Sequence, residues 1–152
     1  MKISSDYKDL LRSLNAAGVR YLIVGGYAVM IYTEPSYTKD LDIWIDPTIE
    51  NAQALFMALS EFGAPLKGIS PRDFTEPEVF YQLGVEPVRV DVLTSVPGLV
   101  FGEAWDRRQA VDFDGEQAFV LGREDLVLSK KLTGRPRDRM HARRLQRPKK
   151  SH

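Results

Sequence analysis

The chain contains no cysteine among its 152 residues, and no internal repeat is visible. Without cysteine it can form neither a disulfide framework nor a thiolate metal site, and it has no thiol nucleophile. It also lacks an apolar run of membrane-spanning length, and its first six residues contain no apolar segment of a secretion signal. We therefore expect a cytoplasmic protein with no membrane partner and no sulfur chemistry.

The chain also lacks net charge, because 21 Lys and Arg residues balance 21 Asp and Glu residues. The balance hides an asymmetry: residues 1–134 have thirteen Lys and Arg against twenty Asp and Glu, a formal charge of −7, and residues 135–152 have eight against one, a formal charge of +7. The cations of this basic tail are Arg135, Arg137, Arg139, Arg143, Arg144, Arg147, Lys149 and Lys150. Such a block commonly contacts phosphate backbones. An equal alternative is a solvated end that neutralises an acidic body.

Two carboxylates stand two residues apart in a segment with strand character. Residues two apart in a strand point to the same face, so Asp40, Asp42 and by extension Asp46 line one face, and the apolar residues between them line the other. Two neighbouring carboxylates repel each other, and Asp is a poor strand former, so this pattern favours a compensating cation such as Mg²⁺. The alternative is that both are solvated residues on an open strand face.

A glycine pair precedes these carboxylates. Residues 20–24 are predicted to form a short buried strand, Gly25 and Gly26 end it, and residues 27–32 are predicted to begin a helix. Free N–H groups at a helix start attract anions, and glycine lets a phosphate approach the main chain closely. An ordinary tight turn would also explain the pair.

A third carboxylate lies in the predicted strand 88–93, where Val88, Val90 and Val92 alternate with other residues and Asp91 points away from the core. If this strand pairs with that of Asp40 and Asp42, three carboxylates share one surface. Such a trio can hold two metal ions, and Asp91 could accept the proton of an attacking hydroxyl. The alternative is an ordinary surface aspartate.

The rest of the chain predicts a scaffold of alternating helices and strands. Helices are expected near residues 5–14, 49–62, 101–108, 123–133 and 138–147, and strands near 79–83, 110–113 and 118–121. The fold class is an α/β (α+β) domain with a mixed twisted β-sheet, its carboxylate face open to a cleft and helices on the other side. Trp44 shares the face of Asp42, where it either packs or stacks on a nucleobase.

The order of these features resembles the nucleotidyltransferase superfamily with the DNA polymerase β-like catalytic fold. An apolar strand, Gly25-Gly26, a gap of thirteen residues, Asp40-Leu41-Asp42-Ile43 and then Asp91 in an apolar strand follow one another as in that superfamily. The chain is most similar to small bacterial and archaeal members related to abortive-infection-type nucleotidyltransferase toxins. In these a helix with an inward lysine leads into a Gly-Arg-Pro-x-Asp turn, as in residues 124–138.

The resemblance implies a minimal nucleotidyltransferase fold and a role for each matching residue. Gly25 and Gly26 would hold the triphosphate, and Lys130 would match the helix lysine that reaches nucleotide phosphates. Asp40, Asp42 and Asp91 would be the catalytic residues and the ligands of Mg²⁺ or Mn²⁺. Residues 1–134 would form the catalytic domain, and residues 135–152 a C-terminal helix and basic tail of the same domain.

The resemblance also implies an activity. The chain would move a nucleoside monophosphate from an NTP such as ATP to a hydroxyl acceptor, as the toxin of a toxin–antitoxin pair. The basic tail and the toxin-like resemblance favour RNA, for example a tRNA end, as the acceptor over a protein side chain or a small antibiotic. Two departures from the family pattern are Ser36, where relatives often have Arg, and His141, where many have Asp. Of the two, Ser36 favours the alternative of a catalytically degenerate protein that binds nucleotide or regulates a partner, and the three retained carboxylates oppose it.

Overall fold

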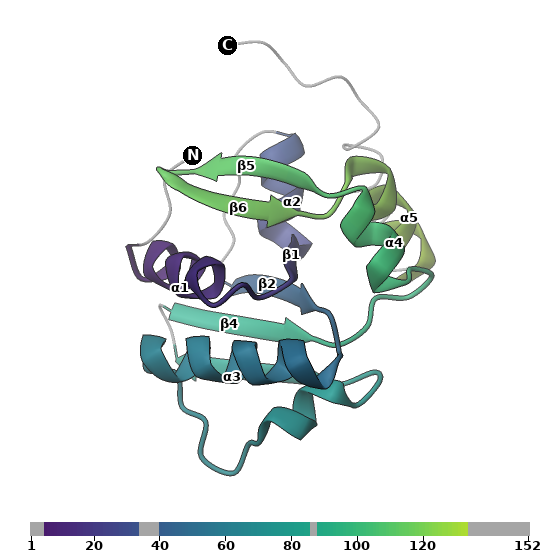
Figure 1. Cartoon of the computed structure of the whole chain (residues 1–152). Coiled ribbons are helices and arrows are strands. Elements are labelled where there is room, and N and C mark those ends of the chain that lie inside the picture. Colours follow the sequence, from purple (N-terminus) through teal and green to yellow (C-terminus); the bar gives the residue numbers. More distant parts are fainter. Residues whose placement is uncertain (1–4, 34–39, 86–87, 134–152) are drawn as a thin grey trace.

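The computed structural model describes residues 5–33, 40–85 and 88–133, which form a mixed α/β fold (Figure 1). Strands and helices lie where the sequence predicts them, with the addition of a short 3₁₀ helix after Ser70. The helix predicted over residues 138–147 lies outside the described residues. The elements in chain order are α1 (Ser5–Ala16), β1 (Tyr21–Val24), α2 (Gly25–Tyr32), β2 (Asp40–Ile45), α3 (Ile49–Phe62), η1 (Pro71–Thr75), β3 (Phe80–Val85), β4 (Val88–Leu93), α4 (Phe101–Asp106), β5 (Gln109–Phe113), β6 (Glu116–Val120) and α5 (Arg123–Thr133).

Six strands form one sheet in the order β3-β4-β2-β1-β6-β5. The central strand β2 pairs parallel with β4 and antiparallel with β1, and the outer pairs β3–β4 and β5–β6 are antiparallel. The sheet is therefore mixed, as predicted. Because β2 is central, both of its neighbours fix its register, and the direction of each side chain on it is well defined.

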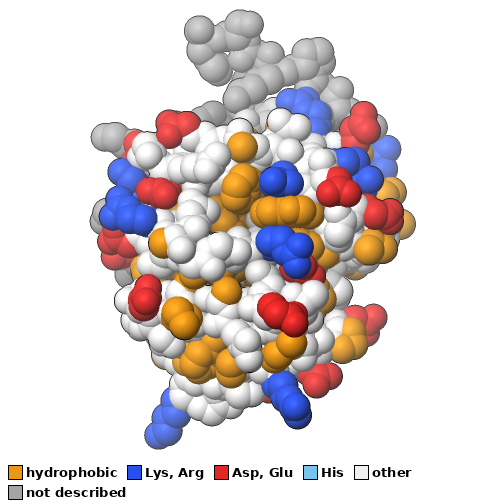
Figure 2. All heavy atoms as spheres, viewed as in Figure 1, with side chains coloured by type: hydrophobic (Ala, Val, Ile, Leu, Met, Phe, Trp, Pro, Cys, Tyr) orange, Lys and Arg blue, Asp and Glu red, His pale blue; other side chains and the backbone are white. Residues whose placement is uncertain are grey.

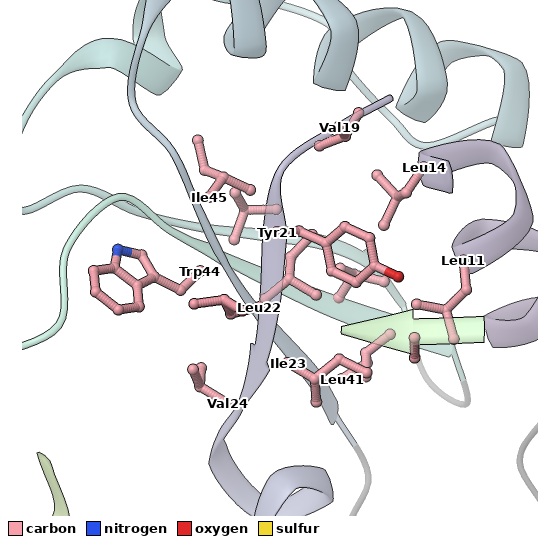
Figure 3. Packing of buried hydrophobic residues seen from close by; sticks show 14 of the residues in the cluster. Leu11, Leu14, Val19, Tyr21, Leu22, Ile23, Val24, Leu41, Trp44 and Ile45 are labelled. Atoms are coloured by element: carbon pink, nitrogen blue, oxygen red, sulfur yellow. The ribbon is translucent and has the colours of Figure 1, made fainter. Parts of the chain in front are cut away.

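One face of β2 belongs to the main core. Leu41, Ile43 and Ile45 have no exposed surface. Helices α1 and α3 pack on this side and cross in front of the strands in Figure 1. Figure 3 shows Leu11 and Leu14 of α1 on the side of β1 to which Tyr21 points, with Trp44 on the opposite side. The apolar alternation read from the sequence thus describes this face correctly.

The boundaries of α3 follow from its end residues. The Thr48 side chain accepts a hydrogen bond from the Asn51 backbone N–H at 3.3 Å, and Gly63 ends the helix in the left-handed conformation at φ 95°. The buried Asn51 amide donates to the carbonyl oxygens of Arg20 and Asp46 at 3.0 and 2.8 Å. These bonds tie the start of α3 to the ends of β1 and β2.

The outer surface over α1 and α3 intersperses acidic and basic side chains with scattered apolar ones (Figure 2). Among the described residues, no helix is both long enough and apolar enough to cross a lipid bilayer.

Candidate active site

Three carboxylates share one surface of the sheet because of the parallel register between β2 and β4. Asp42 lies directly across from Asp91, and Asp40 lies directly across from Arg89. Side chains directly opposite one another on neighbouring strands project to the same face and are close. Asp91 is buried at 7% exposure, whereas Asp40 and Asp42 are half-buried. The structure therefore places the three aspartates singled out in the sequence on one face of the sheet, with Asp42 and Asp91 side by side.

These carboxylates are poorly compensated by the protein around them. Among the described residues, one oxygen on each of Asp40, Asp42 and Asp91 is buried without a hydrogen-bond partner. Asp40 makes one long ion pair, with Arg89 Nε at 3.8 Å from Asp40 Oδ1. A buried unpaired carboxylate oxygen costs stability unless a cation or a proton balances it. The site is thus suited to a positive charge beyond those that the described residues supply.

The same imbalance appears in the ionisation of Asp42. Its pKa is raised from 3.8 to about 8. Burial is the largest cause, followed by a hydrogen bond with Asp91 and by the negative charges of Asp91 and Asp40, whereas the positive charge of Lys130 lowers the pKa. The negative form of Asp42 is therefore disfavoured, and a bound cation would offset this cost.

Gly25 brings the start of α2 against this carboxylate. The helix begins at Gly25, which has a φ of +69°, a conformation that favours glycine. A Cβ at this position would overlap Asp42 Oδ2 and crowd Asp42 Cγ at 2.9 Å. Gly25 is thus needed both for its backbone conformation and for the close approach. Gly26 follows in the first turn, where helix N–H groups have no partner within the helix.

Lys130 of α5 lies close enough to the carboxylates for its positive charge to lower the pKa of Asp42. It is half-buried, whereas the neighbouring Lys131 is exposed. The start of α5 is held by Arg107, whose Nε and Nη2 donate to the Asp125 carboxylate at 2.9 and 3.1 Å. Of the two lysines on this helix, Lys130 is therefore the one directed at the carboxylate site.

Two further contacts fix α5 relative to α2. The Tyr32 hydroxyl donates to the Leu121 carbonyl oxygen at 2.7 Å, and Arg123 Nη2 donates to the Tyr32 carbonyl oxygen at 3.0 Å. The helix that carries Lys130 is thus bonded to the helix that begins at the glycine pair. The sequence does not predict these links, because they join segments about ninety residues apart.

The donor set fits a hard divalent cation. Mg²⁺ takes one or two protein carboxylates directly and completes its octahedron with water and substrate phosphate oxygens. In the described part of the chain, no three His, Cys, Asp or Glu side chains converge closely enough to enclose an ion by themselves. The unpaired oxygens of Asp42 and Asp91 on adjacent strands are consistent with an ion that the substrate helps to hold.

Other residues considered in the sequence have different surroundings. Asp46 pairs with Arg20 at the end of β2 and does not extend the carboxylate face. Trp44 is 1% exposed and packs edge-on against Phe101 at 5.1 Å, so it is a packing residue and cannot stack on a nucleobase. Ser36, His141 and the basic tail lie outside the described residues.

One neighbour of the carboxylates is not predicted by the sequence. Gln82 of β3 lies directly across from Asp91 in the antiparallel register of β3 and β4. It is exposed and shares the carboxylate face. The alternation of residues 80–84 indicates that Gln82 faces away from the core. Only the register of β3 and β4 places it beside Asp91.

Solved structures share this fold over nearly the whole chain. The lincosamide antibiotic adenylyltransferase LnuA with lincomycin bound superposes with a TM-score of 0.62 at 16% identity, covering 95% of this chain and 96% of that one. A Thermotoga maritima protein described as a nucleotidyltransferase gives 0.64 at 20% identity, covering 93% of both chains. ANT(2″)-Ia in complex with adenylyl-2″-tobramycin gives 0.62 at 12% identity, covering 93% of this chain and 85% of that one. At these identities the likeness establishes a common fold.

No curated protein sequence matches the chain significantly. A family model does match, over residues 1–144, and its family is described as a nucleotidyltransferase of unknown function (DUF6036). The match includes the glycine pair, the three aspartates and Lys130. Together with the six-stranded mixed sheet, it shows that the chain belongs to this nucleotidyltransferase family.

Proposed function

We propose that this nucleotidyltransferase moves a nucleoside monophosphate from an NTP to a hydroxyl acceptor with the help of Mg²⁺ or Mn²⁺. The observation that supports this most strongly is the pairing of Asp42 with Asp91 on adjacent parallel strands, each with a buried unpaired oxygen, beside the close approach of Gly25. Residues 1–134 would form the catalytic domain and residues 135–152 its C-terminal extension.

Each element of the site has a role in this proposal. The backbone N–H groups of Gly25 and Gly26 would bind the triphosphate at the start of α2, and Lys130 would contact its phosphates. Asp40, Asp42 and Asp91 would hold the cation. When bound, the cation would neutralise charge on the triphosphate and the departing pyrophosphate. Asp91 lies farther from the glycine turn than Asp42 and would accept the proton of the acceptor hydroxyl.

Two classes of acceptor have support. The basic tail, with its charge of +7, favours RNA such as a tRNA end. Two proteins of the same fold favour a small molecule, since one is a lincosamide antibiotic adenylyltransferase and the other is bound to adenylyl-2″-tobramycin. The toxin role, its antitoxin partner and the cytoplasmic location stay predictions from the sequence.

A second candidate function is nucleotide binding or regulation of a partner without turnover. It is favoured by Ser36, which stands where relatives of the resembled family often have Arg. The three aspartates on one face argue against it, because a protein without turnover has no need to keep them there at a cost in stability.

Transfer itself tests the proposal. Purified protein is incubated with each α-labelled NTP, Mg²⁺ or Mn²⁺, total RNA and a panel of small hydroxylated compounds, and label on an acceptor and released pyrophosphate are measured. We expect transfer that EDTA removes and that Asp42→Asn abolishes. Asp46→Asn is the matched control, because it removes a carboxylate that lies just after β2 and pairs with Arg20. Tight NTP binding with no transfer under any condition would support the regulatory alternative.

A further inference from the structure

The carboxylate surface continues beyond Asp91 onto the edge strand β3. Gln82 is directly across from Asp91, and Phe80 is directly across from Leu93. Because side chains alternate along a strand, Phe80 and Gln82 project to the carboxylate face. The intervening side chains project to the other face, where Leu83 is 4% exposed and Tyr81 packs edge-on against Phe74 at 5.2 Å.

An aromatic ring is thus presented to solvent next to the proposed reaction centre. Phe80 is 57% exposed, although a Phe on a sheet face is normally covered. Gln82 is also exposed and offers an amide that can both donate and accept hydrogen bonds. The two side chains form an apolar and a polar contact point on one strand, about 7 Å apart along it.

A hollow of about 470 Å³ adjoins this strand face. Phe80 and Leu93 contribute from the sheet, and the turn after β4 closes the hollow on another side; its lining residues are Glu78, Val79, Phe80, Leu93, Ser95, Val96, Pro97 and Gly98. The turn is itself supported by α5, because Gly98 lies against the Leu132 side chain. The volume falls within the range of about 300 to 1,000 Å³ that is common for small-molecule sites.

The hollow lies on the acceptor side of the proposed centre. Across the sheet, the order is β1 with Gly25 at its end, β2 with Asp42, β4 with Asp91 and β3 with Gln82. A triphosphate at Gly25 and a molecule in the hollow would therefore approach Asp91 from opposite sides. The wall residue Leu93 is two positions from Asp91 along β4, a distance of about 7 Å that a single sugar or six-membered ring spans.

The surroundings of the hollow are acidic. Glu78 is the charged residue among those that line it. The carboxylates of Asp42 and Asp91 lie on the sheet face that the hollow adjoins. Among the described residues, the cations on this face are Arg89, which is placed against Asp40, and Lys130, whose charge acts on Asp42. A polyanion such as an RNA backbone is repelled at such a surface, whereas a neutral or cationic molecule is not.

We infer that this hollow, with Phe80 and Gln82, is the acceptor site and takes a small, neutral or cationic molecule with a flat apolar ring beside its hydroxyl. The inference rests on the proposed function for its reaction. Phe80 packs against the ring, and Gln82 is a positioning residue that hydrogen-bonds the acceptor and directs its hydroxyl toward Asp91.

The transfer forms one bond to phosphorus and breaks another. The acceptor hydroxyl oxygen forms a bond to the α-phosphorus, and the bond from that phosphorus to the oxygen bridging to the β-phosphorus breaks. Pyrophosphate leaves with the electron pair, and the hydroxyl proton passes to the Asp91 carboxylate.

Binding of a charge-matched set of probes tests the site without turnover. The probes are benzyl alcohol, 4-(aminomethyl)benzyl alcohol and 4-(hydroxymethyl)benzoate, which share a ring and a hydroxyl and differ in charge. Ligand-observed NMR titrations of the full chain should show the neutral and cationic probes binding at least fivefold more tightly than the anionic one. Phe80→Ala should weaken the first two at least fivefold, Phe80→Tyr should restore them, and Met57→Ala, an equally exposed apolar residue on α3, should change nothing.

Gln82 has its own readout in the transfer assay. Gln82→Leu should lower kcat at least tenfold for a small acceptor, with little change in the KM for NTP. A merely structural role of Gln82 would instead change both kcat and this KM, or neither of them. Equal weak binding of all three probes, or no effect of Phe80→Ala, would overturn the inference. The inference would also be overturned by an RNA oligonucleotide that covers Phe80 and competes with the probes for binding. Charge-selective probe binding without any transfer would instead reject the proposed function and leave the binding site standing.

Discussion

The two faces of strand β2 differ in how well their side chains are satisfied. On one face, Leu41, Ile43 and Ile45 are completely buried among α1, α3 and the neighbouring strands. On the other face, Asp40 and Asp42 each retain a buried oxygen without a hydrogen-bond partner among the described residues. The first face stabilises the fold by removing apolar surface from water. The second lowers stability, and such a cost is typically retained where a ligand compensates it.

The contrast also runs along the carboxylate face itself. Two residues beyond Asp42, Trp44 is covered by Phe101 and belongs to the core. The functional part of β2 is therefore confined to its first half, next to the glycine turn, and α4 closes the remainder. This division explains why the carboxylates can be altered without removing the packing that holds the strand.

The largest effect is expected from Asp91→Asn on the carboxylate face. A neutral amide cannot bind the cation as a carboxylate does or accept the acceptor proton, and cation stabilisation is worth several kcal/mol in the transition state. Transfer should fall by roughly a thousandfold or more, since about 1.4 kcal/mol corresponds to tenfold in rate. Circular dichroism should be unchanged, and Asp112→Asn on the edge strand β5 is the control. A variant that keeps a tenth of the activity would remove Asp91 from the reaction.

The opposite face should respond in stability and not in chemistry. Ile43→Ala leaves a cavity beneath α1 and α3 and should lower the free energy of unfolding by about 2 to 4 kcal/mol. Urea titration measures this loss. The KM for NTP should stay within about twofold of the original at a temperature where the variant is folded. If Ile43→Ala instead raised that KM with stability intact, the separation of the two faces would be wrong.

The two lysines of α5 sharpen the same comparison on one helix. Lys130→Ala should raise the apparent KM for NTP roughly 10- to 100-fold, because a charge-assisted phosphate contact contributes about 1.5 to 3 kcal/mol. Lys131→Ala should change it less than about threefold, since Lys131 is exposed. Steady-state kinetics at saturating acceptor measure the KM for NTP of each variant. Equal changes in KM at both positions would show that α5 does not face the nucleotide.

The smallest effect concerns the basic tail. Changing Arg143, Arg144 and Arg147 to Glu should leave NTP binding unaltered. If the tail binds RNA, each lost phosphate contact should reduce the slope of the logarithm of RNA affinity against the logarithm of salt concentration by about 0.7 to 0.9. RNA binding whose affinity and salt slope survive the triple change would assign the tail to solvation.

Local patterns in the sequence were sufficient for most elements and for one face of the sheet. Alternation identified β2 and β4, and Thr48 and Gly63 marked the ends of α3 as the structure has them. Local patterns failed where tertiary contacts decide. Ile49 is an apolar residue of the predicted helix 49–62 and is 39% exposed, because it lies in the first turn of α3.

The candidate site depended on strand register, which no local pattern contains. The sequence predicts that Asp42 and Asp91 each face away from the core, but not that β2 and β4 are parallel and in register at these residues. For the same reason Gln82 and the hollow beside Phe80 were not predicted, and Asp46 was placed with the other aspartates although Arg20 draws it away.

The measurement that tests the central claim most directly is the stability of Asp42→Asn against pH, with and without Mg²⁺ and NTP. The folded-state pKa of Asp42 is about 8 against an ordinary 3.8, so its contribution to stability is fully present below about pH 4 and is lost as pH rises through 8.

The Asp42→Asn variant carries no charge at this position and escapes that loss of stability. We therefore expect Asp42→Asn to melt above the original protein at pH 8, by about 2 to 4 °C for each kcal/mol regained, and to match it at pH 4. Mg²⁺ with NTP should raise the melting temperature of the original protein and barely affect the variant. A variant less stable than the original at pH 8, or one that Mg²⁺ and NTP stabilise equally, would contradict the account.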